Sequence, residues 1–141
     1  MISQTAKHAL AALTFLAELP AGHYAGAAEI AAEIIAPRNY LGKLLKTLAD
    51  EGLVESQKGR GGGVRLARSP ESVSLLEAVE RIDRMNRWSD CFLGRGRCSA
   101  NGPCAVHERW AEVRRTYLSF LRETTIGDLA TRAKRETSQS S

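Results

Sequence analysis

The sequence predicts a mainly α-helical fold with one small β-hairpin, and three observations lead to this prediction. Apolar residues recur at helical spacing over residues 3–19, 27–33 and 38–51. The spacing then changes to that of two short strands over residues 53–57 and 64–67. Helical spacing returns afterwards and continues through a long stretch near the carboxyl end. We therefore expect three short helices, a hairpin and then further helices, the last of them long.

The expected helices carry signals for where they begin and end. Ser3 can cap the first helix, because its hydroxyl can accept a hydrogen bond from a free backbone N–H group. Pro37 suits the first position of the third helix, and Gly52 suits a carboxyl-terminal stop. Ser74 and Glu77 have the spacing of a capping box, which predicts a fourth helix after the hairpin.

The segment between the two predicted strands is basic and rich in glycine, with the sequence Lys58-Gly59-Arg60-Gly61-Gly62-Gly63. This composition is typical of a tight hairpin tip. Three short helices followed by such a hairpin is the order of elements in a winged helix-turn-helix domain. The helix that begins at Pro37 would then be the recognition helix, and the hairpin would be the wing.

Seven residues of this helix and hairpin are candidates for contact with DNA. Cationic side chains neutralise phosphates, whereas Asn and Arg pair with base edges, and an arginine at a hairpin tip can enter a minor groove. The net charge of +4 and a pI near 9.2 agree with a polyanionic partner. A merely solvated polar face is the alternative. The candidates are Arg38, Asn39, Tyr40, Lys43, Lys46, Lys58 and Arg60.

Gly42 interrupts the recognition helix. A glycine inside a helix costs about 1 kcal/mol relative to alanine. Its small size would allow close approach of another helix or of DNA, and the sequence leaves both explanations open.

All three cysteines lie within the 18 residues from Asp90 to His107. The other residues of this stretch are largely glycine, proline and polar types, which favour a loop. The first residues lack the pattern of a signal peptide, and no apolar run reaches the roughly 18 residues of a membrane span, so we expect a cytoplasmic protein. In a reducing compartment, clustered cysteines in odd number indicate a metal or redox site rather than disulfides.

The last long helix carries apolar residues at spacings of four, three, four and three, which is a heptad pattern. This pattern predicts a homodimer interface, which suits a DNA-binding protein because two-fold proteins match palindromic operators. An amphipathic helix packed on its own domain is the alternative. The predicted interface residues are Val106, Trp110, Val113, Tyr117 and Phe120.

Taken together, these features resemble the Rrf2 family of bacterial winged-helix regulators. The features are the Gly59-Arg-Gly-Gly-Gly hairpin with the leucine-rich helix before it, Cys91-x6-Cys98-x5-Cys104-x2-His107, and Thr125-Ile126-x-Asp128-Leu129. The resemblance covers residues 3–130. It implies a homodimeric transcription factor, usually a repressor, that senses redox, iron or nitric oxide status through a [2Fe–2S] or [4Fe–4S] cluster. We place the [2Fe–2S] form first.

The resemblance also implies the cluster ligands, namely Cys91, Cys98, Cys104 and a fourth group. His107 matches the fourth ligand of IscR-like members, whereas NsrR-like members use a carboxylate on the first helix of the other subunit. His8 lies in the corresponding stretch here, so it stays an alternative to His107. Thiolates with one histidine are an accepted ligand set for iron–sulfur clusters. A zinc site or a thiol-redox regulator without a cluster is the alternative, although gaps of six and five residues fit zinc less well.

An enzyme is not expected. A cysteine beside His107 could act as a nucleophile with its base, but the sequence shows no recognisable oxyanion motif. The glycine run at the hairpin also lacks the Gly-Lys-Ser/Thr ending of a phosphate-binding loop. An adaptor that used only the long helix would leave the basic hairpin unexplained.

These interpretations divide the chain into four parts. We expect a winged helix-turn-helix DNA-binding domain at residues 1–84 and a cluster-binding loop at residues 85–104. A dimerisation helix with a final turn would follow at residues 105–131, and a disordered tail at residues 132–141.

Overall fold

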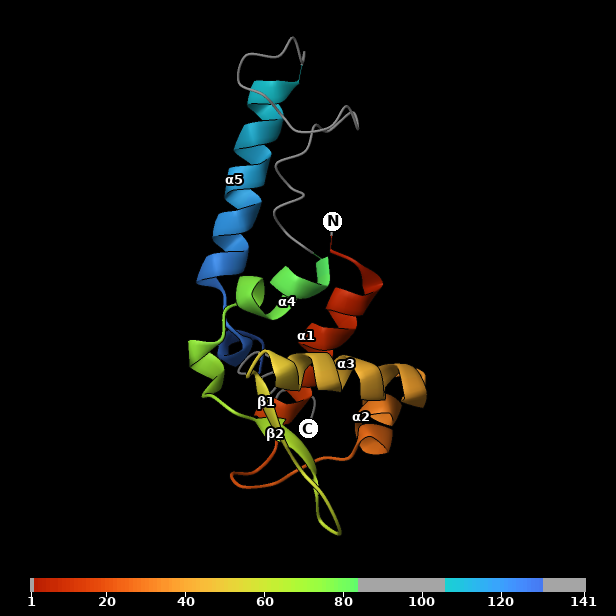
Figure 1. Cartoon of the computed structure of the whole chain (residues 1–141). Helices are drawn as coiled ribbons and strands as arrows, with labels where there is room; N and C mark the ends of the chain where they lie inside the picture. Colours follow the sequence, from red (N-terminus) through yellow and green to blue (C-terminus); the bar gives the residue numbers. More distant parts are fainter. Residues whose placement is uncertain (1, 84–105, 131–141) are drawn as a thin grey trace, which may run out of the picture.

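The computed structural model describes residues 2–83 and 106–130, and it confirms a mainly helical fold with one hairpin (Figure 1). Helices α1 to α4 form one body, from which α5 extends on one side and the hairpin on another. None of the described helices is long and apolar enough to cross a membrane. In chain order the elements are α1 (Gln4–Ala17), α2 (Ala27–Ile34), α3 (Arg38–Asp50), β1 (Val54–Gln57), β2 (Gly63–Leu66), a 3-10 turn (Pro70–Ser72), α4 (Leu75–Asp83) and α5 (His107–Glu123).

The predicted helix signals act largely as expected. The Ser3 hydroxyl accepts a hydrogen bond from the Ala6 N–H at 3.0 Å and so caps α1. Gly52 follows α3 with a φ of +77°, a conformation that glycine adopts without strain. Pro37 differs slightly from the prediction, because it is the N-cap residue of α3 and Arg38 is the first helical residue. A proline fits there since no helical hydrogen bond requires its missing N–H.

The apolar stripe of α3 lies entirely in the core. Leu41, Leu44, Leu45 and Leu48 are each at most 5% exposed, and they belong to one buried cluster with residues of α1, α2 and α4. Burying a leucine side chain contributes roughly 1.5–3 kcal/mol. This burial fixes the rotation of α3 about its axis and therefore turns its polar residues outward.

The hairpin is tied to the loop between α1 and α2. Strands β1 and β2 pair antiparallel, with Val54 opposite Leu66 and Gln57 opposite Gly63. Ala25 and Val64 exchange two backbone hydrogen bonds of 2.9 and 2.8 Å. A Cβ atom on Gly63 would lie 2.3 Å from the Ala25 carbonyl oxygen, so this close pairing requires glycine.

The carboxyl end of α5 returns to the same core. The Leu75 N–H donates to the Thr124 carbonyl, and the Ile126 N–H donates to the Val73 carbonyl, both at 2.9 Å. Leu121 and Ile126 are 1% and 0% exposed. Residues 126–130 form the expected final helical turn. One end of α5 is therefore anchored in the winged-helix body.

The turn between α2 and α3 contains a conformation that the sequence does not suggest. Ile35 has a φ of 56° and a ψ of 64°, in the left-handed region, and its side chain is 88% exposed. The Ala36 N–H donates to the Ala31 carbonyl at 3.0 Å, as in helix ends that usually carry glycine. A residue with a Cβ atom costs roughly 1–2 kcal/mol in this conformation.

Candidate nucleic-acid interface

The outward face of α3 carries four of the predicted DNA-contact residues. Because the leucines occupy the opposite face, Arg38, Asn39, Lys43 and Lys46 are all exposed. Residues three or four apart in a helix lie on one face, so these side chains form a continuous polar surface. It begins at the first turn of the helix, which is the part of a recognition helix that contacts base edges.

Tyr40 is placed differently from the other six candidates. Its side chain is half-buried, and its hydroxyl lies 3.2 Å from Nδ1 of His8 on α1. The two rings meet edge to face, with centroids 5.5 Å apart. Nε2 of His8 lies 3.2 Å from the Gln4 side-chain nitrogen, so both nitrogens of this imidazole face groups of their own chain. The Tyr40 hydroxyl therefore connects α3 to α1.

The wing tip presents Arg60 at the corner of a tight turn. The Gly62 N–H donates to the Gly59 carbonyl at 3.0 Å, which closes a four-residue turn with Arg60 in its second position. Gly61 follows with a φ of +72°, as the third residue of a type II turn requires. A Cβ atom on Gly62 would lie 2.2 Å from the Gln57 carbonyl oxygen. Lys58 and Arg60 are both exposed at this tip.

Arg65, at the base of the wing, has a different role. Its Nε donates to the Glu55 carboxylate on the facing strand at 2.5 Å, and its guanidinium lies 4.7 Å from the ring centroid of Tyr24. The hydrogen bond with Glu55 is the main cause that raises the pKa of Arg65. This arginine links both strands to the loop between α1 and α2, so it orients the wing. This role carries no local sequence signal, because Tyr24 is distant from Arg65 along the chain.

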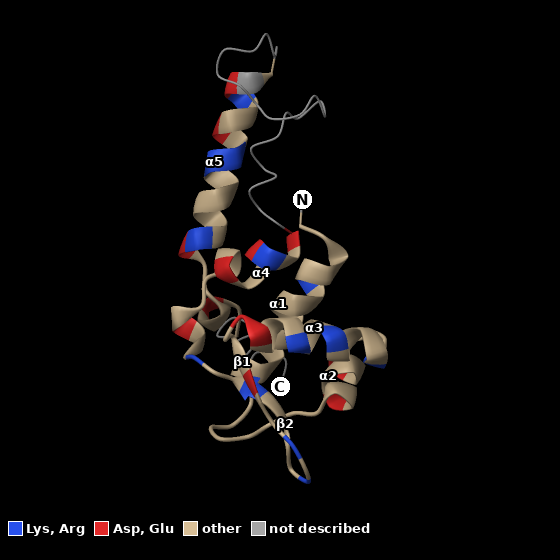
Figure 2. Ribbon diagram, in the orientation of Figure 1, with Lys and Arg blue, Asp and Glu red and all other residues tan. Residues whose placement is uncertain are grey.

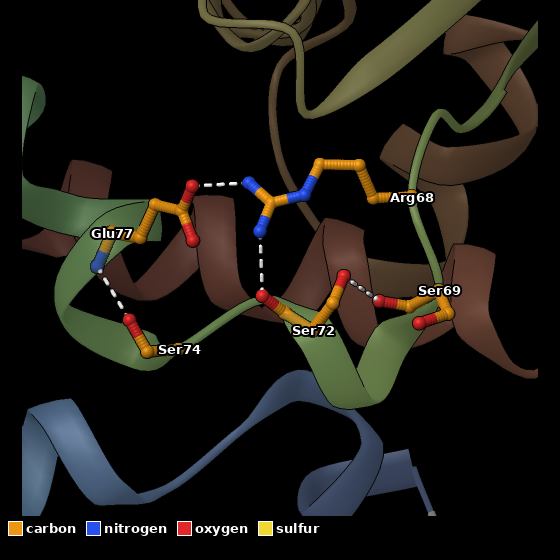
Figure 3. A network of polar contacts seen from close by, with 5 residues as sticks. All are labelled: Arg68, Ser69, Ser72, Ser74 and Glu77. Carbon is orange, nitrogen blue, oxygen red and sulfur yellow. Dashed lines mark hydrogen bonds and ion pairs between the residues drawn. The ribbon is translucent and has the colours of Figure 1, made fainter.

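Arg68 is likewise engaged within the protein, where the wing leads into α4 (Figure 3). It forms an ion pair with Glu77, and its Nη2 donates to the Ser72 carbonyl at 2.6 Å. The Glu77 N–H donates to the Ser74 hydroxyl at 3.1 Å, as predicted for the capping box. Of the predicted capping box, the structure therefore shows the hydrogen bond to the Ser74 hydroxyl. The Glu77 carboxylate pairs with Arg68 and does not complete the box.

The cations of α3, the wing and the segment just after it differ in whether they have a carboxylate partner. Arg65 and Arg68 have carboxylate partners. Arg38, Lys43, Lys46, Lys58 and Arg60 have no carboxylate of the described residues within ion-pair distance. Figure 2 places this second group on α3 and at the tip of the wing. These five positive charges lie on two neighbouring elements and are open to an external anion.

The predicted dimer seam lies along α5 and is partly exposed. Val113 and Phe120 are 49% and 52% exposed, whereas Val106, Trp110 and Tyr117 are half-buried. The rings of Tyr117 and Phe120 stack with centroids 6.4 Å apart. Burial, and to a smaller extent the charge of Asp83, raise the pKa of Tyr117. Val113, Tyr117 and Phe120 also line a shallow apolar groove of about 430 Å³.

The predicted ligands lie largely outside the described part of the chain. Cys91, Cys98 and Cys104 fall in residues 84–105, and His107 is described only as the first residue of α5. Within residues 2–83 and 106–130, no three histidine, cysteine or acidic side chains come together as a metal site.

A family model described as Rrf2, iron-dependent transcriptional regulator, matches residues 2–132. A protein of Aquifex aeolicus classed as an HTH-type transcriptional regulator is 34% identical over 131 residues, which is 92% of this chain and 90% of the relative. The HTH-type transcriptional regulator NsrR of Bacillus subtilis is 30% identical over 123 residues, which is 86% of this chain and 84% of the relative.

Among solved structures, the fold is similar to that of CymR, the global cysteine regulator of Bacillus subtilis. The TM-score is 0.79, over 93% of this chain and 96% of that chain, with 24% sequence identity. The similarity extends beyond the winged-helix body, because it covers nearly the whole length of both chains.

Proposed function

Because the chain belongs to the Rrf2 family of winged-helix transcriptional regulators, we propose that it is a repressor that binds a palindromic operator under the control of an iron–sulfur cluster. The family and the relatives are transcriptional regulators, so the prediction that the chain is not an enzyme is confirmed. The observation that carries the DNA-binding part is the set of five unpaired cations on α3 and the wing tip.

We assign α3 to the major groove. Arg38 and Asn39 stand at its first turn, where guanidinium and amide groups reach guanine and adenine edges. Lys43 and Lys46 follow on the exposed face and would neutralise phosphates. Each neutralised phosphate releases counterions, so affinity should fall steeply as salt rises.

We assign the wing tip to the neighbouring minor groove. Arg60 is at the corner of a turn in which Gly61 has a positive φ and Gly62 leaves no room for a Cβ atom. A guanidinium held at the end of a narrow hairpin can enter a minor groove, where it responds to groove width. Lys58 would contact a phosphate beside it. The link of Arg65 with Glu55 and Tyr24 would keep the tip at a fixed angle to α3.

The donor set of the chain fits an iron–sulfur cluster. Three thiolates from Cys91, Cys98 and Cys104 with one imidazole, from His107, are ligands that such clusters accept. The bound cluster would supply a redox- and nitric-oxide-sensitive centre. His8 is a less favoured fourth ligand, because its ring nitrogens already face Tyr40 and Gln4. Zinc, or thiols without a metal, would use the same cysteines.

We assign α5 to a homodimer. Val113 and Phe120 are apolar and about half exposed on a helix of 17 residues, roughly 26 Å long. A second copy would cover these side chains, and two winged domains would then face the two halves of a palindrome.

The segment with the cysteines is attached to the DNA-binding body at two points. At its start, the Asp83 carboxylate accepts hydrogen bonds from the N–H (2.8 Å) and the hydroxyl of Ser3. Ser3 caps α1, and α1 contacts the recognition helix through His8 and Tyr40. The segment leads into the amino end of α5, and the opposite end of that helix is anchored in the body by Leu121 and the residues that follow it. We propose that a change in the segment reaches α3 through Asp83, Ser3 and α1.

The test is purification and DNA binding without oxygen. We expect a coloured protein that contains iron and acid-labile sulfide, and Cys98→Ala should remove the colour while the protein stays folded. His107→Ala should shift the visible spectrum, whereas the matched variant His23→Ala, in an exposed turn, should not. Colourless protein with stoichiometric zinc would instead support the alternative of a zinc site without a cluster.

The DNA-binding part of the proposal has its own test. Arg60→Ala should weaken DNA binding by about 1–3 kcal/mol. Unchanged affinity would show that the wing does not touch DNA.

A further inference from the structure

We infer that Gly42 is the point at which α3 approaches DNA most closely, and that its missing side chain helps to determine which sequences the protein binds. This inference rests on the proposed DNA-binding function of α3.

Nothing within the described protein requires a glycine at this position. Gly42 lies inside α3, where glycine is among the least favourable residues for a helix. Its φ is not in the left-handed region, unlike that of Gly52 or Gly61. A Cβ atom built on Gly42 meets no described atom within 4 Å, whereas one built on Gly63 collides with the backbone. Neither backbone conformation nor close packing of a described helix explains the residue.

Gly42 is exposed at the centre of the polar face of α3. Arg38 and Asn39 are four and three residues before it, and Lys46 is four residues after it, so all three are its neighbours on the helix surface. The helix backbone is therefore uncovered in the middle of the surface assigned to DNA. Of the two explanations that the sequence left open, close approach of DNA remains and packing against a described helix does not.

A side chain at this position would hold α3 away from base edges by about the width of a methyl group. Hydrogen bonds to bases depend on distance and angle, so Arg38 and Asn39 would lose their best geometry. Alanine is also the most favourable helix residue. Gly42→Ala should therefore stabilise the protein and weaken DNA binding at the same time, and misfolding cannot produce this combination.

The experiment uses the full-length protein without oxygen and a fluorescein-labelled duplex that the unsubstituted protein selects from a random-sequence library. Gly42→Ala should raise the midpoint of thermal unfolding and reduce affinity by about tenfold, which is the effect of one poor base contact. Thr47→Ala is the matched control on the same helix. Thr47 is exposed, lies about 140° around the helix from Gly42 and lines a groove with residues of α1 and α4. Thr47→Ala should therefore stabilise the helix without a loss of affinity for DNA.

Lys46→Ala separates failure of this inference from failure of the proposed function. If Lys46→Ala weakens binding and Gly42→Ala does not, the inference is wrong and the DNA-binding assignment of α3 stands. If Lys46→Ala and Arg38→Ala both leave affinity unchanged, α3 does not contact DNA and both fail. A second selection from the random library, with Gly42→Ala, should yield a changed sequence preference. An unchanged preference would overturn the role of Gly42 in specificity.

Discussion

Helices α3 and α5 carry similar rows of apolar residues, but only α3 buries its row completely. Its four leucines are at most 5% exposed, whereas Val113 and Phe120 of α5 are 49% and 52% exposed. The apolar row of α3 is covered by other residues of its own chain. The opposite, polar face is left for an external partner. The apolar row of α5 is only partly buried, so we expect the partner that covers it to be apolar. The same pattern thus serves folding in α3, and in α5 we propose that it serves association.

The contrast also occurs within α5 itself. Phe120 is 52% exposed, and the next residue, Leu121, is 1% exposed. Leu121 belongs to the core of the winged-helix body, as does Ile126 after it. Figure 1 shows the rest of α5 extending away from that body. The helix is therefore both a part of the domain at one end and a projecting surface along the remainder.

The largest effect should follow from a change in the buried row of α3. Leu48 is fully buried, and Leu48→Ala should lower the free energy of unfolding by about 2–5 kcal/mol, because it leaves a cavity in the core. Chemical denaturation measures this loss. A loss below about 1 kcal/mol would mean that the core around α3 repacks, and the fixed orientation of its polar face would then be in doubt.

The next largest effect should concern association. Phe120→Ala should weaken the dimer by about 1–3 kcal/mol, as expected for an aromatic interface residue, and should change the stability of the fold much less. Analytical ultracentrifugation at several concentrations measures the dissociation constant. Leu121→Ala is the matched control, since it should destabilise the fold itself. An unchanged dissociation constant for Phe120→Ala would place the dimer interface elsewhere.

A smaller effect, of opposite sign, is expected in the turn before α3. Ile35→Gly should raise the free energy of unfolding by about 0.5–1 kcal/mol, because glycine relieves the left-handed strain but adds freedom to the unfolded chain. Ile35→Ala keeps a Cβ atom and should gain less. If the two variants are equally stable, the conformation of Ile35 carries no strain.

The smallest effect should come from Glu51, at the carboxyl end of α3. Burial raises the pKa of this carboxyl group, Arg81 opposes the shift, and Glu80 and Glu77 add to it. Its Oε1 is buried without a hydrogen-bond partner among the described residues. A raised pKa means that the contribution of Glu51 to stability is fully present below its ordinary value of 4.5 and is lost as pH rises through the folded-state value.

Glu51→Gln removes this titration. The variant should therefore be more stable than the original protein at pH 7, and the difference should shrink as the pH is lowered toward 4. Thermal unfolding across this pH range gives the comparison. A difference that is constant with pH would show that the charge of Glu51 is not responsible.

Much of this architecture could be predicted from the sequence, because the signals were local. The leucine spacing predicted the buried face of α3, Ser3 and Ser74 predicted caps, and the glycine run predicted the wing tip. The exposure of Arg38, Asn39, Lys43 and Lys46 follows directly from the position of the leucines.

The remaining features depend on contacts between distant segments that carry no local pattern. Ala25 pairs with Val64, and Thr124 accepts a hydrogen bond from Leu75, but neither pair stands in a recognisable strand. The contact of His8 with Tyr40 likewise joins two helices at positions that helical spacing alone does not distinguish. Ile35 occupies a place where glycine is usual, so tertiary context overrides the local preference there.

In the proposed regulator, the segment with the cysteines controls the surface formed by α3 and the wing. The most direct test measures, without oxygen and at one salt concentration, the affinity of the cluster-loaded and the cluster-free protein for the same selected duplex. We predict that the two affinities differ by about 5- to 150-fold, the usual range for coupled sites. Equal affinities, for a protein shown to hold iron and sulfide, would contradict this account.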